Sequence, residues 1–147
     1  MIFRDVGQVM SERQDPEPGA FEAFRRAEEL VSAGRPLDAL RELRLVMDAE
    51  PDSPNVMQLA GRAYLNSAQF GRAEQAFRRL VERDPSDHYA LFALGKTLQR
   101  QGRLTEAVAR LRLAVAMNPL PEYQEALGEV STGIALRAKR NSDGLTG

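Results

Sequence analysis

The sequence predicts an all-α solenoid, that is, a stack of helix pairs, and three observations support this class. Pro51, Pro85 and Pro119 follow one another at intervals of 34 residues. Segments that begin at residues 20, 54 and 88 share columns of small and of large residues. Each segment also has a break near its middle, which divides it into two helices of about 14 residues. Because proline marks helix boundaries, this spacing predicts a repeated helix pair.

The shared columns indicate how the two helices of each pair pack. Small residues recur where neighbouring helices must approach closely, and large apolar residues recur where a gap must be filled. The three columns are Ala27, Gly61 and Gly95; Ala39, Ala73 and Ala107; and Leu43, Phe77 and Leu111. The predicted repeats are therefore residues 20–53, 54–87 and 88–121.

The break in each repeat predicts a tight turn between its two helices. Gly34 and Gly102 suit a left-handed residue that closes the first helix, and Pro36 suits the first turn of the second helix. In the middle repeat the equivalent position is Ala68, so we expect a similar but less favourable turn there.

Residues outside the repeats have separate predicted roles. The last repeat needs a cover, and residues 122–138 place Tyr123, Leu127, Val130 and Ile134 on one side of a capping helix. Residues 139–147 are expected to be a flexible tail. Residues 1–19 are expected to be an N-terminal extension, with a short amphipathic segment at residues 2–10 and a polar linker.

Two stretches carry a family resemblance. "MQLAGRAY" with "AEQAF" and a proline, and "LFALGKTL" with "AVARL" and a proline, resemble tetratricopeptide repeats. The resemblance covers residues 20–121 and suggests a small bacterial three-repeat protein. It implies a right-handed superhelix whose concave groove is lined by the first helix of each pair.

The same resemblance indicates which side chains line the groove. It would have aromatic residues at both ends, amides in the middle and a basic strip, a surface suited to a peptide with apolar and acidic residues. A second interpretation is that the chain's own ends cover the aromatic residues. The candidate residues are Phe21, Phe24, Glu28, Asn55, Gln58, Arg62, Asn66, Tyr89, Phe92, Lys96, Gln99 and Arg100.

Some members of the family clamp the terminal carboxylate of a chaperone peptide with lysine, asparagine and arginine. None of the matching positions has such a side chain, so this kind of binding is not predicted. These positions are Phe24, Glu28, Leu59, Tyr89 and Ala93.

Composition and motifs argue against other classes of function. The chain has 147 residues, no cysteine and a net charge of −1, which gives no general attraction for nucleic acid. It has one histidine, His88, and no phosphate-binding or nucleophile motif, so we expect no enzyme, metal or cofactor. We find no apolar run long enough for a signal peptide or a membrane span and expect a cytoplasmic protein.

The leading functional hypothesis is a non-catalytic adaptor that binds a peptide segment of a partner protein in the groove. One alternative is a holding or secretion-type chaperone, since small three-repeat chaperones resemble this chain in architecture. Another is a self-assembly module. Residues 2–10 are expected to dock on the repeats, either as an internal lid or as a homodimer contact, with a simple tail as the third possibility.

Overall fold

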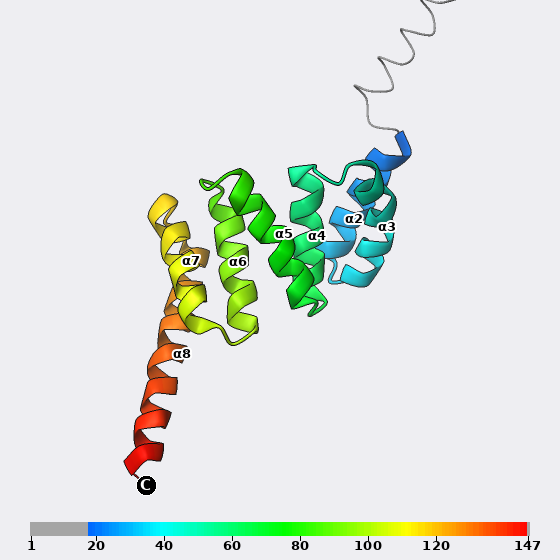
Figure 1. Ribbon diagram of the computed structural model, residues 1–147. Helices are drawn as coiled ribbons and strands as arrows, with labels where there is room; N and C mark the ends of the chain where they lie inside the picture. The colour runs from blue at the N-terminus through cyan, green and yellow to red at the C-terminus, as the bar shows by residue number, and fades with distance from the viewer. Residues whose placement is uncertain (1–17, 147) are drawn as a thin grey trace, which may run out of the picture.

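The computed structural model describes residues 18–146, and this part of the chain consists of seven α-helices. They follow one another in a single row of antiparallel hairpins (Figure 1). The helices are α2 (Pro18–Ser32), α3 (Pro36–Ala49), α4 (Pro54–Asn66), α5 (Phe70–Arg83), α6 (His88–Arg100), α7 (Leu104–Met117) and α8 (Pro121–Thr146).

The helices pack in the order of a solenoid. α2 packs on α3, α4 on α5 and α6 on α7, and the second helix of each pair also packs on the first helix of the next. The first helices α2, α4, α6 and α8 approach one another in succession, whereas in the described chain the backbones of α3, α5 and α7 do not. The stack therefore curves with the first helices on its concave side. The predicted fold class is confirmed.

The turns within the pairs have the predicted backbone. Gly34 has a φ of 73° and Gly102 a φ of 76°, and Ala68 takes the same left-handed conformation with a φ of 62°. An alanine in this region costs roughly 1 kcal/mol, so the middle turn is the least favourable of the three. Ser53 and Asp87 cap α4 and α6 by accepting hydrogen bonds from the backbone N–H groups of Val56 and Ala90.

The glycine column has the predicted packing role. A Cβ atom on Gly61 would lie 2.8 Å from the ring of Phe77, and one on Gly95 would lie 2.7 Å from Leu111 Cγ. Both large side chains come from the second helix of the same pair and are fully buried. Close approach of the paired helices therefore requires glycine at both positions.

The last helix is longer than the sequence suggested. We predicted a capping helix over residues 122–138 followed by a flexible tail, but α8 begins at Pro121 and continues to Thr146. No proline follows Pro121 to interrupt the helix. The C-terminal part of α8 projects past α6 and α7 (Figure 1). The prediction that residues 2–10 dock on the repeats concerns a segment outside the described residues.

Candidate functional site

The concave face brings together several of the predicted groove residues from neighbouring first helices. The rings of Tyr89 and Phe92 lie 6.2 Å apart on α6, and Lys96 Nζ lies 5.2 Å from the centre of the Phe92 ring. Burial raises the pKa of the Tyr89 hydroxyl, an effect that the charge of Arg62 on α4 opposes. Arg62, Tyr89 and Lys96 thus lie near one another on the first helices α4 and α6.

The C-terminal end of this face is covered by α8. Phe92 is only 4% exposed because the ring of Tyr123 stacks on it, with 4.5 Å between the ring centres. The Tyr123 hydroxyl in turn lies 2.8 Å from Nδ1 of His88, and Nε2 of His88 faces the amide of Asn118. The prediction that Phe92 is an exposed groove residue is therefore wrong, because α8 fills this end of the groove with an aromatic ring.

At the N-terminal end of the face, the described residues 18–146 leave a pocket open. A pocket of about 190 Å³ is lined by Phe21 and Phe24 of α2, by Asn55 and Val56 of α4, and by neighbouring residues of α3 and the turn after it. Phe21 is 57% exposed, and Phe24 is half-buried. The two aromatic ends predicted for the groove are therefore not equivalent, since one is open and the other is closed.

Basic side chains lie between the two ends. Arg62 and Lys96 are half-buried, and neither makes an ion pair within the described residues. Two other predicted groove residues, the half-buried Gln58 of α4 and the exposed Glu28 of α2, also lie on first helices. An acidic ligand that lies along the first helices would therefore find two cations without an ion pair on α4 and α6, whereas the only charged residue of the described chain that lines the pocket is Glu50.

The remaining predicted residues lie at the far ends of their helices. Asn66 is the exposed last residue of α4, and Gln99 and Arg100 end α6. The guanidinium of Arg100 lies 5.1 Å from the centre of the Phe70 ring, at the start of α5. Arg100 is thus held at the turn between α4 and α5 and does not extend the strip formed by Arg62 and Lys96.

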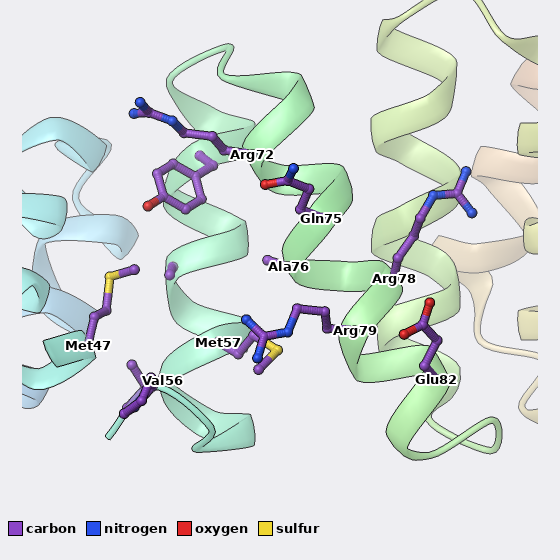
Figure 2. A pocket seen from close by; sticks show the side chains of 12 residues that line it. Met47, Val56, Met57, Arg72, Gln75, Ala76, Arg78, Arg79 and Glu82 are labelled. Atoms are coloured by element: carbon purple, nitrogen blue, oxygen red, sulfur yellow. The ribbon is translucent and has the colours of Figure 1, made fainter. Parts of the chain in front are cut away.

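A larger cleft lies on the convex side, between second helices, and shares Val56 with the concave pocket. It was not predicted from the sequence. It has a volume of about 630 Å³ and runs between α3 and α5, with α4 as its floor (Figure 2). Arg78 and Arg79 of α5 are among the residues that line it. The signal that could have revealed the cleft is the pair of small residues Ala60 and Ala76 that line it.

Residues 18–146 contain neither a metal-binding cluster nor a membrane-spanning helix. No group of three or more His, Asp and Glu residues there could hold a metal ion. Within residues 18–146, no helix is both long and apolar enough to cross a membrane. His88 is engaged by Tyr123 and Asn118 and so stabilises the contact between α6 and α8.

This arrangement of helix pairs defines a class of protein. Residues 59–120 match the family model described as tetratricopeptide repeat, and the three pairs with their added helix have the fold of a tetratricopeptide repeat protein. The chain is 29% identical over 104 residues to mouse "Superkiller complex protein 3". That match covers 71% of this chain and only 6% of the mouse protein.

Solved structures show the same fold. The first tetratricopeptide domain of Spaghetti (RPAP3), bound to the HSP90 peptide SRMEEVD, superposes with a TM-score of 0.72 at 21% identity, covering 82% of this chain and 96% of that domain. MamA from Desulfovibrio magneticus RS-1 gives a TM-score of 0.74 at 18% identity, covering 91% of this chain and 84% of the other. At these identities the likeness shows the fold, and the relatives span animals and bacteria.

Proposed function

We propose that this protein is a non-catalytic adaptor that binds a peptide segment of a partner protein on its concave face. The observation that carries the proposal is the open pocket lined by Phe21, Phe24 and Asn55. Its volume of about 190 Å³ suits one large apolar side chain. Aromatic pockets of this kind supply most of the binding energy in many protein interfaces.

The charges further along the concave face suggest the chemistry of the peptide. Arg62 and Lys96 carry unpaired positive charges in the described chain, so acidic residues next to the apolar anchor would pair with them. The peptide bound by the Spaghetti domain, SRMEEVD, is also acidic. That parallel supports an acidic partner here without identifying it.

The mode of recognition differs from a terminal carboxylate clamp. Two of the clamp positions, Leu59 and Ala93, are buried in the core of this protein. The others are Phe24, Glu28 and Tyr89, which provide no cation. We therefore propose that the partner segment is read by its apolar anchor and acidic side chains, wherever it lies in the partner.

The test is a pull-down with mass spectrometry, using the wild type and two variants. Phe24→Ala removes a wall of the pocket, and Leu45→Ala changes an exposed residue of α3 that lies outside it. We expect a specific partner that Phe24→Ala loses, by more than about 1 kcal/mol of binding free energy, and that Leu45→Ala retains.

Other results of the same experiment would contradict the proposal. Capture of many unfolded clients would indicate a holding chaperone, and capture of this chain alone would indicate a self-assembly module. A specific partner that binds equally well to Phe24→Ala would place the site elsewhere on the molecule.

A further inference from the structure

The cleft on the convex side is continuous and mostly apolar at its base. Its floor is formed by Val56, Met57, Ala60 and Tyr64 of α4, and Met47 of α3 faces the side chains of α5 across it (Figure 2). A second pocket of about 360 Å³ continues the cleft along α3 and shares Met47, Tyr64 and Arg72 with it. An extended peptide or one face of a helix would find a long groove here.

Comparison with the next repeat explains why the cleft is open. One repeat further along, the positions equivalent to Ala60 and Ala76 are occupied by Leu94 and Arg110. Leu94 is fully buried and fills the floor between α5 and α7, and Arg110 is half-buried at the equivalent place on α7. The space between α3 and α5 therefore results from two small side chains, with the backbone pattern of the repeat unchanged.

The same comparison shows that the cleft lacks the carboxylate that forms an ion pair with the equivalent arginine at the next junction. Between α5 and α7, Arg78 NH2 lies 3.6 Å from Glu106 Oε2. The matching columns between α3 and α5 hold Arg44 and Arg72, so two positive charges replace an ion pair. Both residues line the cleft, and within residues 18–146 neither makes an ion pair.

The other charges of the cleft do not supply what is missing. Arg41 and Arg79 bind Asp38 and Asp52 at 3.4 and 3.2 Å, on the outer rim. Asp48 and Glu82 also line the cleft, but neither makes an ion pair with its arginines within the described chain. The guanidinium of Arg72 is held over the ring of Tyr64, 6.0 Å from its centre, and therefore stays at the cleft wall.

We propose that the cleft between α3 and α5 binds a segment of a partner protein that carries an acidic side chain next to a large apolar one. The carboxylate pairs with Arg44 and Arg72, in the place that Glu106 takes at the next junction. The apolar side chain fills the space above Ala60 and Ala76. The cleft and the concave pocket share only Val56 among their lining residues, so substitutions at their other residues test the two sites separately.

The experiment uses two substitutions that copy the next repeat into the cleft. Ala60→Leu introduces the residue found at Leu94, and Arg72→Glu introduces the residue found at Glu106. A phage library of random 12-residue peptides is selected on the immobilised full-length chain, with an excess of the Ala60→Leu/Arg72→Glu double variant in solution. This competitor removes peptides that bind anywhere except the cleft.

We expect enriched peptides in which an acidic residue lies close to Phe, Leu, Met or Trp. A fluorescein-labelled copy of the best peptide should bind at least tenfold more weakly to each single variant, as measured by fluorescence polarisation. Phe24→Ala changes a residue of the concave pocket that does not line the cleft, so it should change the affinity of this peptide less than twofold. Thermal melting of each variant checks that the fold is retained.

Three outcomes would overturn the inference. The first is the absence of enriched peptides, and the second is enriched peptides without acidic residues. The third is a lower mass per particle for the double variant than for the wild type in light scattering, which would assign the cleft to a second copy of the chain.

Discussion

The two junctions between repeats share one backbone pattern and differ in their side chains. Between α5 and α7, Arg78 and Arg103 bind Glu74 and Glu106 in a network of four ion pairs above a floor that contains Leu94. Between α3 and α5, the floor is Ala60, and the walls carry unpaired arginines. The residues at a few equivalent positions of the repeats therefore decide whether a junction is closed and stabilising or open and available to a ligand.

The same contrast extends along the whole stack. One cluster of buried residues runs from α4 through α8 and includes Phe92 and Tyr123, whereas the first repeat is held by two smaller clusters. The exposed aromatic pocket and the convex cleft both lie in the N-terminal half. We infer that the C-terminal half stabilises the fold, while the N-terminal half offers surfaces for recognition.

The largest expected effect on stability comes from removing the ring of Phe92, which α8 covers. Phe92→Ala removes a buried aromatic side chain that stacks on Tyr123, so it should lower the free energy of unfolding by about 3 to 5 kcal/mol. Phe21→Ala, the same change at an exposed site, should cost less than about 0.5 kcal/mol. Urea unfolding followed by circular dichroism measures both. Equal losses would contradict the division into a closed half and an open half.

A smaller effect on stability distinguishes a glycine in a paired helix from a glycine in α8, which has no second helix of its own pair in the described chain. Gly95→Ala forces a Cβ to within 2.7 Å of Leu111 and should destabilise the protein by about 1 to 3 kcal/mol. Gly128 lies at the same distance from the start of α8 as Gly95 does in α6, but no atom lies within 4 Å of its Cβ position. Gly128→Ala should therefore stabilise the protein by about 0.5 to 1 kcal/mol.

Opposite signs for these two substitutions in thermal melts would confirm that α7, the second helix of this pair, imposes the need for glycine at position 95. A stabilising Gly95→Ala would instead show that Leu111 can move aside at no cost.

The fold could be predicted because its determinants repeat along the chain. The spacing of Pro51, Pro85 and Pro119 marks a helix boundary that recurs in every repeat, and the column of small residues Ala27, Gly61 and Gly95 marks a close approach of helices that recurs in every pair. The end of α8 could not be predicted in this way. Residues 139–146 form a polar segment with no equivalent position in the repeats. Their sequence alone therefore does not indicate whether the helix continues or the segment loses its order.

The site was harder to predict because it depends on what the non-repeating parts cover. Tyr123 was correctly placed on the apolar side of the last helix, but only the path of α8 shows that its ring lies on Phe92. The convex cleft arises from Ala60 and Ala76, which are ordinary residues for a helix. Only comparison with Leu94 and Arg110, once the two junctions are seen in space, shows that they leave a gap.

The closed junction should also be sensitive to acid. Burial tends to raise the pKa of the Glu74 carboxyl, but hydrogen bonds donated by Arg78 and Arg103 outweigh it and hold the pKa below the ordinary value of 4.5. The folded state therefore favours the charged form of Glu74. This preference adds to the free energy of unfolding at neutral pH, and the added stability is lost as the pH falls through the folded-state pKa of Glu74.

Glu74→Gln should accordingly be less stable than the wild type at neutral pH, and the difference should shrink below pH 4.5. Thermal melts across this range measure it. Glu82→Gln is the matched control on the same helix, because Glu82 makes no ion pair in the described chain. A difference that is constant with pH would exclude an ionic contribution from Glu74.

The smallest expected effect comes from closing the open junction electrostatically. Arg72→Glu places a carboxylate in the column of Glu106, opposite Arg44, and should create the pair that Arg78 and Glu106 make at 3.6 Å. Because both side chains remain in contact with solvent, we expect a coupling of about 0.2 to 1 kcal/mol. A double-mutant cycle with Arg44→Ala and Arg72→Glu isolates this pair, since it subtracts what each substitution does alone. The coupling should weaken as salt is raised, because exposed ion pairs are screened. A coupling of zero at low salt would mean that Arg44 and Arg72 lie too far apart to share one carboxylate, and it would weaken the case for an acidic ligand in the cleft.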